Sequence, residues 1–427
     1  MGRELSRRRL WGPTRAGFGR KMLYDRRIPV SPEPVAAAAV VPRAASSQRD
    51  LRLDLFRGLA LWLIFLDHIP SNIVSWGTIR NYGFSDAAEI FIFISGYTAA
   101  FVYGRAMRER GFIIASARIL KRAWQIYVAH MFLFVIYMAE IAYVSSSFEN
   151  PLYHEEMGIF DFLKQPDVTL IQALLLKFKP VNMDVLPLYI VLLLGFPPAL
   201  WLLQRQATVA LAASAALYAL TWHFGWNLPA YPTGSWWFNP FAWQLLFVLG
   251  AWCALGGAGR IGRFTRSPVV LALAAAYLVF AFAVVMTWYF PPLAPLVPKW
   301  LGDVMYPIDK INLDVLRIIH FLALAAITVR FVPLDWPGLQ SRWLRPAILC
   351  GQHSLEIFCL GIFLSFAGHF VFNEISDAVF MQVLVSAVGI AIMVAAAALI
   401  AWYKSIEGRS PGSRSKPPDA DLAGGEA

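Results

Sequence analysis

Charged residues are scarce in this sequence of 427 residues, because Asp, Glu, Lys and Arg together make up only 15% of it. In soluble globular proteins about a quarter of the residues are charged. Hydrophobic residues account for 58% of the chain, and its mean hydropathy is +0.55. A chain with so few charges cannot cover a water-facing surface of this size. We therefore expect much of the folded surface to face lipid, as in an integral membrane protein.

Cysteine is also rare, and the three cysteines, Cys253, Cys350 and Cys359, all lie in apolar segments. They show neither CxxC nor CxxxH spacing, which indicates small buried side chains and neither a disulfide framework nor a metal site. The sequence contains no GxSxG motif, no P-loop and no cluster of metal ligands. It therefore predicts no bound metal.

The two ends of the chain are polar. Residues 1–50 contain eleven Lys and Arg residues, a composition that predicts a disordered basic arm in the cytoplasm. The first apolar stretch begins only after position 50 and lacks a small-residue cleavage site, so this arm is not an ordinary signal peptide. Residues 404–427 are rich in Pro and Gly and predict a disordered cytoplasmic tail. The expected membrane domain therefore covers residues 51–403.

Ten apolar runs divide this domain, and most are long enough to span about 30 Å of hydrocarbon at about 1.5 Å per helical residue. They predict an all-α fold, a polytopic bundle of about ten transmembrane helices. The runs lie near residues 53–69, 84–103, 122–145, 185–203, 207–224, 241–257, 268–290, 313–332, 347–370 and 379–403.

The distribution of basic residues predicts the orientation. The formal net charge is +10, and with the N-terminus inside, thirteen Lys and Arg residues fall in inner connections and six in outer ones. Cytoplasmic connections carry such an excess, so we expect both termini to lie in the cytoplasm. Basic connections also suit anionic membrane lipid. No soluble domain with a basic face is apparent, and we expect no binding to nucleic acid.

Ionisable residues inside membrane helices are costly, so each of them is a candidate for function. Asp67 and His68 end the first apolar run, toward its outer side. A histidine can accept a proton near neutral pH, and the adjacent Asp67 can tune it or hold a different partner. A histidine near a helix end is otherwise often a structural residue that forms a hydrogen bond.

Asp86 and Glu89 open the second run at the same outer level as His68. Because they are three residues apart, they share one helix face and can orient the imidazole or hold substrate hydroxyls. The alternative is a polar cap at the helix end. Further along, Ser95 and Gly96 remove side-chain bulk and predict close packing of two helices.

Arg118, Lys121 and Arg122 form a basic face where the third run begins, at the predicted inner surface. They are either positive-inside anchors or a clamp for a phosphorylated cytosolic donor, to which arginine offers bidentate contacts.

Five further candidates lie in the predicted outer half and are expected to bind substrate if they converge on a polar chamber. The segment 225–240 is uncharged and dense in Trp, Tyr and Pro, so it predicts either an interfacial belt or a surface that stacks on sugar rings. The five candidates are Asp184, Asn239, Gln244, Lys310 and Arg317.

The first run carries Arg52, Asp54, Arg57 and Gly58, followed by His68, and resembles the opening helix of the acyltransferase 3 superfamily. The fuller segments RLDLFRGLALWLIFLDHIPSN, FSDAAEIFIFISGY, DVLPLYIVLLL, FNPFAWQLLFVLG and GQHSLEIF are similar to the OpgC family. Five blocks in order are more specific than one motif, and they extend from about residue 50 to residue 403.

This resemblance implies a ten-span protein of the bacterial inner membrane that is associated with succinyl substitution of osmoregulated periplasmic glucans. It implies an O-acyltransferase with acyl-CoA, and specifically succinyl-CoA, as co-substrate. The acceptor is then a glucan or another cell-surface polysaccharide, and glucan-biosynthesis proteins are possible partners. The superfamily histidine corresponds to His68, and its cytoplasmic basic motif corresponds loosely to Arg118 and Arg122.

The expected mechanism gives each of these residues a role. His68 removes the proton from the attacking hydroxyl while Asp86 or Glu89 orients it, and a covalent acyl-histidine relay also fits. Oxyanion donors are expected among Lys310, Asn239 and Arg317. Two alternatives remain: a transporter of an anionic metabolite or lipid-linked sugar, and a degenerate acyltransferase fold that serves as an assembly partner in glucan export.

Overall fold

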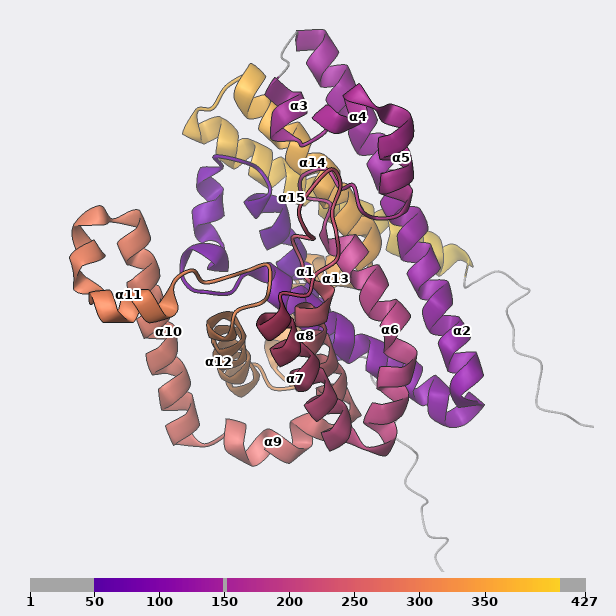
Figure 1. Cartoon of the computed structure of the whole chain (residues 1–427), viewed down its shortest axis with the longest axis vertical. Helices are drawn as coiled ribbons and strands as arrows, with labels where there is room; N and C mark the ends of the chain where they lie inside the picture. Colours follow the sequence, from indigo (N-terminus) through magenta and orange to yellow (C-terminus); the bar gives the residue numbers. More distant parts are fainter. Residues whose placement is uncertain (1–49, 149–151, 408–427) are drawn as a thin grey trace, which may run out of the picture. The chain divides into compact units, whose positions relative to one another are not determined.

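The computed structural model describes residues 50–148 and 152–407, and these residues fold almost entirely into helices (Figure 1). In these two ranges the only strand-like pairing is an isolated bridge between Pro229 and Ser235. The helices are α1 (Leu51–Asp67), α2 (Ala87–Phe148), α3 (Leu152–Glu156), α4 (Phe160–Lys164), α5 (Pro166–Leu174), α6 (Val185–Arg205), α7 (Ala207–Phe224), α8 (Pro240–Trp252), α9 (Ala258–Thr265), α10 (Pro268–Tyr289), α11 (Lys299–Met305), α12 (Val315–Phe331), α13 (Arg345–Gln352), α14 (Ser354–Glu374) and α15 (Val379–Glu407).

The all-α prediction is confirmed. The predicted N-terminal arm lies outside the described residues, as does nearly all of the predicted C-terminal tail. Each of the ten apolar runs coincides with helical structure, although α2 contains both the second and the third run. Gly111 interrupts α2 between these runs, with a left-handed backbone conformation at φ 82°. Glycine tolerates this conformation because it has no Cβ atom.

Seven helices are long and apolar enough to cross a membrane. Two further helices in the described ranges, α1 and α12, have 17 residues each. The seven are α2, α6, α7, the segment Pro240–Thr265, α10, α14 and the segment Val379–Ile406.

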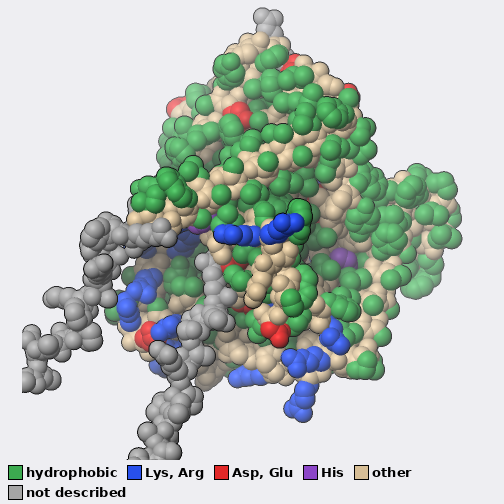
Figure 2. Space-filling model, turned by 180° about the vertical axis from the view of Figure 1, so that it is seen from behind, with side chains coloured by type: hydrophobic (Ala, Val, Ile, Leu, Met, Phe, Trp, Pro, Cys, Tyr) green, Lys and Arg blue, Asp and Glu red, His purple; other side chains and the backbone are tan. Residues whose placement is uncertain are grey.

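Large apolar side chains remain exposed on the outer helices. Val279 on α10 is 67% exposed and Phe380 on α15 is 75% exposed. Figure 2 shows hydrophobic side chains over most of one face, with Lys and Arg gathered mainly toward its lower part. An apolar surface of this extent suits contact with lipid tails and not with water. The chain is therefore a membrane protein.

The core depends on helix pairs whose backbones lie close together. On α2 and α8, a Cβ added at Gly96 would collide with the carbonyl of Phe247, and one added at Gly250 would collide with that of Phe93. The predicted close packing at Gly96 is confirmed. On α1 and α13, a Cβ added at Gly58 or at Gly351 would likewise collide with the backbone of the facing helix.

Replacing Gly96 with alanine is expected to destabilise the protein by about 1–3 kcal/mol, because the new methyl group forces α2 and α8 apart. Gly195, on an open face of α6, is the matched control, since a Cβ added there meets no atom within 4 Å. Gly195→Ala should be neutral or slightly stabilising, because alanine favours the helix. Thermal unfolding of both variants in detergent tests this, and equal midpoints would contradict it.

Candidate active site

A cavity of about 740 Å³ lies where α1 and α10 end and where α2, α6 and α12 begin. Helix ends bring polar side chains together here, because the side chains that precede or open each helix project into the same space. Six of the sequence-predicted residues line this cavity, namely Asp67, His68, Asp86, Asp184, Lys310 and Arg317.

His68 lies just beyond the last residue of α1, and a backbone contact fixes its ring. Its Nδ1 atom is 2.6 Å from the carbonyl oxygen of Ile64. A carbonyl accepts only, so Nδ1 carries the proton and Nε2 is left as the basic nitrogen. Burial lowers the pKa of His68 to about 4, with a smaller opposing contribution from the Ile64 bond. The imidazole is therefore neutral at pH 7, and its Nε2 atom is unprotonated.

Asp86 and Glu89 form a reciprocal cap at the start of α2. The Ala88 amide donates to Asp86 Oδ1 at 2.8 Å, and the Asp86 amide donates to Glu89 Oε2 at 2.9 Å. This is the capping-box arrangement, in which two amides at the helix start are satisfied together. The polar-cap alternative therefore describes one role of these two carboxylates.

The same two carboxylates also hold two cations. Lys310 Nζ donates to Asp86 Oδ2 at 2.6 Å, and Arg317 Nη2 donates to the same oxygen at 3.2 Å. Arg317 Nε donates to Glu89 Oε1 at 2.8 Å. Burial alone would raise the pKa of Asp86, but Lys310 and Arg317 more than offset this and hold it well below its usual range. Asp86 is thus ionised and holds both cations beside the cavity.

Among the described residues no hydrogen bond joins Asp86 or Glu89 to His68, so the expectation that one of them orients the imidazole stays a prediction. The imidazole donates its hydrogen bond to the Ile64 carbonyl, and both carboxylates are engaged by Lys310 and Arg317. Glu89 is fully buried and does not line the cavity. Its place is behind Arg317, where it positions the guanidinium.

Neither Asn239 nor Gln244 lines the cavity, so the structure does not bring them together with the other predicted substrate-binding residues. Asn239 is fully buried and caps α8, where its Oδ1 accepts from the Phe241 amide and its Nδ2 donates to the Trp226 carbonyl. Gln244 exchanges hydrogen bonds with Ser214 and so joins α8 to α7. Both amides are satisfied within the protein, and their roles in this structure are structural.

Asp67 and Asp184 each have a partner in the cavity wall. Thr78 Oγ1 donates to Asp67 Oδ1 at 2.7 Å. Asp184 lies 3.8 Å from Lys179 Nζ, and that ammonium also lies over the Trp236 ring at 4.1 Å. Burial raises the pKa of Asp184 to about 6 and lowers that of Lys179 to about 8. Both groups can therefore change charge near physiological pH.

Several cavity residues were not predicted individually from the sequence, although Trp237 lies in the aromatic segment 225–240. Lys179 and Asn182 lie in the long connection before α6, and Arg80 lies in the connection after α1. The aromatic residues Trp237 and Trp288 lie at the ends of other segments. Their connections fold back over the helix ends, an arrangement that hydropathy does not reveal. The nearness of Lys179 to Asp184 in the sequence is a signal that could have indicated their pairing.

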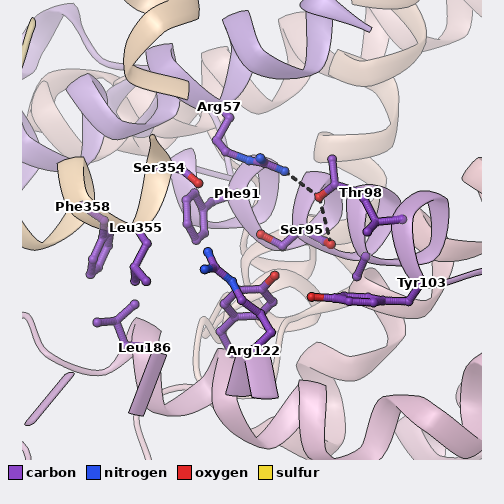
Figure 3. Close-up of a pocket in the computed structure, with 13 residues that line it drawn as sticks. Arg57, Phe91, Ser95, Thr98, Tyr103, Arg122, Leu186, Ser354, Leu355 and Phe358 are labelled. Atoms are coloured by element: carbon purple, nitrogen blue, oxygen red, sulfur yellow. Dashed lines mark hydrogen bonds between the residues drawn. The ribbon is translucent and has the colours of Figure 1, made fainter. Parts of the chain in front are cut away.

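A second, smaller pocket of about 150 Å³ lies further along α2 and α6 (Figure 3). The guanidinium groups of Arg57 and Arg122 both point into it, beside Ser95, Thr98 and Tyr103. Arg57 Nη2 donates to Thr98 Oγ1 at 2.6 Å. The pocket can therefore hold an anionic or strongly polar group.

Of the three predicted clamp residues, only Arg122 lines this pocket. Arg118 and Lys121 are exposed and do not line it. Arg118 lies one helical turn before Arg122 on the same face, so the position along the helix, and not the face, separates the two arginines. Arg57, which the sequence placed near the start of α1, takes the second cationic position.

The two spaces adjoin along two helices. Ala88 on α2 lines the cavity and Phe91 lines the pocket, one helical turn apart. On α6, Val185 lines the cavity and its sequence neighbour Leu186 lines the pocket. Within residues 50–148 and 152–407, no group of three His, Cys, Asp or Glu side chains is arranged to hold a metal ion. The arrangement offers a base, fixed cations and an adjoining polar pocket.

Comparison with known proteins identifies a family for this chain. A protein-family model described as OpgC protein matches residues 49–405, which is most of the chain. No curated protein and no solved structure matches it.

Proposed function

Since this chain belongs to the OpgC family, we propose that it is a membrane-embedded O-acyltransferase that transfers a succinyl group from CoA to hydroxyl groups of periplasmic glucans. One observation carries the proposal. His68 presents a neutral imidazole, with Nε2 as its basic nitrogen, to a large cavity lined by fixed cations. General-base catalysis on a hydroxyl requires an unprotonated base, and histidine is the side chain that most often provides it.

We further propose that the chain crosses the bacterial inner membrane ten times, with both termini in the cytoplasm. Dividing α2 at Gly111 and adding α1 and α12 brings the seven long apolar helices to ten. A helix of 17 residues reaches roughly 26 Å, close to the thickness of the hydrocarbon core. The excess of basic residues in the inner connections supports this orientation. His68 then lies toward the periplasm and Arg122 toward the cytoplasm.

In the proposed reaction the donor enters from the cytoplasm, with its phosphates beside Arg122 and Arg57. Its acyl thioester extends along α2 and α6 toward the outer cavity, where the acceptor binds. Nε2 of His68 takes the proton from the acceptor hydroxyl as the oxygen attacks the thioester carbon. The new C–O ester bond forms, the C–S bond breaks, and the proton passes from His68 to the departing sulfur.

The negative oxygen of the tetrahedral intermediate requires nearby donors. Lys310 and Arg317 are held at the cavity by Asp86 and Glu89, which fixes them before the reaction begins. Lys179 is a third candidate, since its ammonium lies in the same wall. A relay through an acyl-imidazole on His68 uses the same groups.

The proposal is tested with purified protein in lipid nanodiscs, isotope-labelled succinyl-CoA and a soluble glucan. A labelled ester on the glucan, detected by mass spectrometry, supports it. Passage of labelled substrate across a sealed vesicle without formation of an ester favours the transporter alternative.

Replacing Arg122 with alanine is expected to raise KM for acyl-CoA about tenfold, because a charge-assisted contact to a phosphate contributes about 1.5 kcal/mol or more. Arg118→Ala is the matched control, since it removes an exposed arginine one helical turn away. Steady-state kinetics over donor concentration separate the two variants. An equal change in KM for both would contradict the assignment of the pocket to the donor.

A further inference from the structure

Three aromatic side chains line the outer cavity while remaining substantially exposed. Trp237 lies in the connection before α8, and Trp288 and Tyr289 end α10. They are 53%, 47% and 37% exposed, respectively. These rings come from different parts of the chain but border one space, which distinguishes them from aromatic residues scattered over the surface.

The local backbone presents Trp237 outward. Its neighbours Trp236 and Phe238 are both buried, the first beneath the Lys179 ammonium and the second against Trp243 with ring centroids 4.8 Å apart. With both neighbours anchored in the protein, Trp237 is left on the open side. Its indole therefore borders the cavity without being packed into the core.

The two rings of α10 are held by their polar atoms. Trp288 Nε1 donates to Tyr306 Oη at 2.6 Å, and Tyr289 Oη donates to Asn81 Oδ1 at 2.6 Å. Tyr289 also packs against Trp76, with ring centroids 4.5 Å apart. The rings are thus fixed before any ligand arrives, so little side-chain entropy is lost when a ligand stacks on them.

The neighbouring polar groups narrow the class of ligand. Asn182, Asp184 and Arg80 line the same cavity and offer both donors and acceptors. A lipid tail would leave these groups without partners, at a cost in free energy. A sugar ring has apolar C–H faces that stack on aromatic rings and a rim of hydroxyls that pair with amides and charged groups.

We propose that Trp237, Trp288 and Tyr289 form an aromatic platform that binds a sugar ring of the acceptor chain next to the ring that is acylated. This inference rests on the proposed function, which requires a hydroxyl-bearing acceptor in the same cavity. A volume of about 740 Å³ is in the range of pockets that enclose ligands larger than one small ring. The platform therefore favours an oligosaccharide over a monosaccharide.

The test measures binding of neutral glucose oligosaccharides of increasing length to the protein in nanodiscs, without donor, by isothermal titration calorimetry. Trp237→Leu and Trp288→Leu are expected to weaken binding of the longer oligosaccharides about three- to tenfold each, the range for loss of one aromatic contact. Trp237→Phe, which keeps an aromatic face, should restore most of the affinity and so excludes misfolding as the cause.

Trp226→Leu is the matched control. Trp226 lies in the same connection and is 45% exposed, but it does not line the cavity. Its replacement should leave oligosaccharide affinity unchanged. If Trp237→Leu binds as wild type does, or if Trp226→Leu loses as much affinity, the platform is overturned and these rings belong to an interfacial aromatic belt.

Failure of the proposed function gives a different result. In that case the wild type forms no ester with any acceptor, even where oligosaccharide binding depends on Trp237. Conversely, if Trp237→Leu forms the ester with the same dependence on oligosaccharide concentration as the wild type, that result overturns the platform alone.

Discussion

Replacing His68 with alanine is expected to lower kcat for acyl transfer by about 10²- to 10⁴-fold, the usual contribution of a positioned general base. The expected loss follows from the position of Nε2, since within the described cavity wall His68 is the only imidazole. Donor binding should change little, because the arginine-lined pocket lies elsewhere along α2. Single-turnover kinetics with purified protein measure the effect on chemistry alone.

His223→Ala provides the control, because that histidine is exposed in the last turn of α7 and does not line the cavity. It should retain wild-type kcat. A His68→Ala variant with more than about half of the wild-type kcat would show that the imidazole is structural. Incubation with donor alone separates the two routes, since a relay leaves a succinyl adduct on His68 and direct transfer leaves none.

Replacing Arg317 with methionine is expected to destabilise the protein by about 3–5 kcal/mol, the cost of leaving a buried charge without its partner. Glu89 is fully buried, and Arg317 Nε is its donor at 2.8 Å. Thermal unfolding in detergent, followed by intrinsic fluorescence, measures the change.

A double variant shows whether the pair is the cause. Glu89→Gln removes the charge and keeps an amide that can still contact the start of α2, so adding it to Arg317→Met should recover much of the lost stability. Two single effects that simply add in the double variant would contradict coupling between these side chains.

The helical fold could be predicted from the sequence because hydropathy directly reports which segments avoid water. The ten apolar runs all lie in helices, and the small residue Gly96 indicated a close approach that the structure places between α2 and α8. The position of a pocket along a helix is not encoded so simply. Arg118, Lys121 and Arg122 share a basic helix end, yet only Arg122 lines the inner pocket.

In the outer cavity, too, some residues could be predicted from the sequence and others could not. Residues at helix ends, such as His68, Asp86 and Asp184, could be identified because ionisable groups at those positions are costly. Asn239 and Gln244 had similar positions but serve as a helix cap and an interhelical contact. Lys179 and Trp237 depend on how long connections fold back over the bundle, and no periodic pattern specifies this. Three-dimensional proximity was required to place them.

The central claim is tested most directly by the succinyl content of periplasmic glucans in cells that lack this protein. The cells are complemented with wild type or with His68→Ala at matched membrane abundance, and anionic substituents on the extracted glucans are quantified. We expect wild type to restore these substituents and His68→Ala to leave the glucans neutral. Equal restoration by both would contradict the catalytic role of His68, and no change with either would contradict the glucan as acceptor.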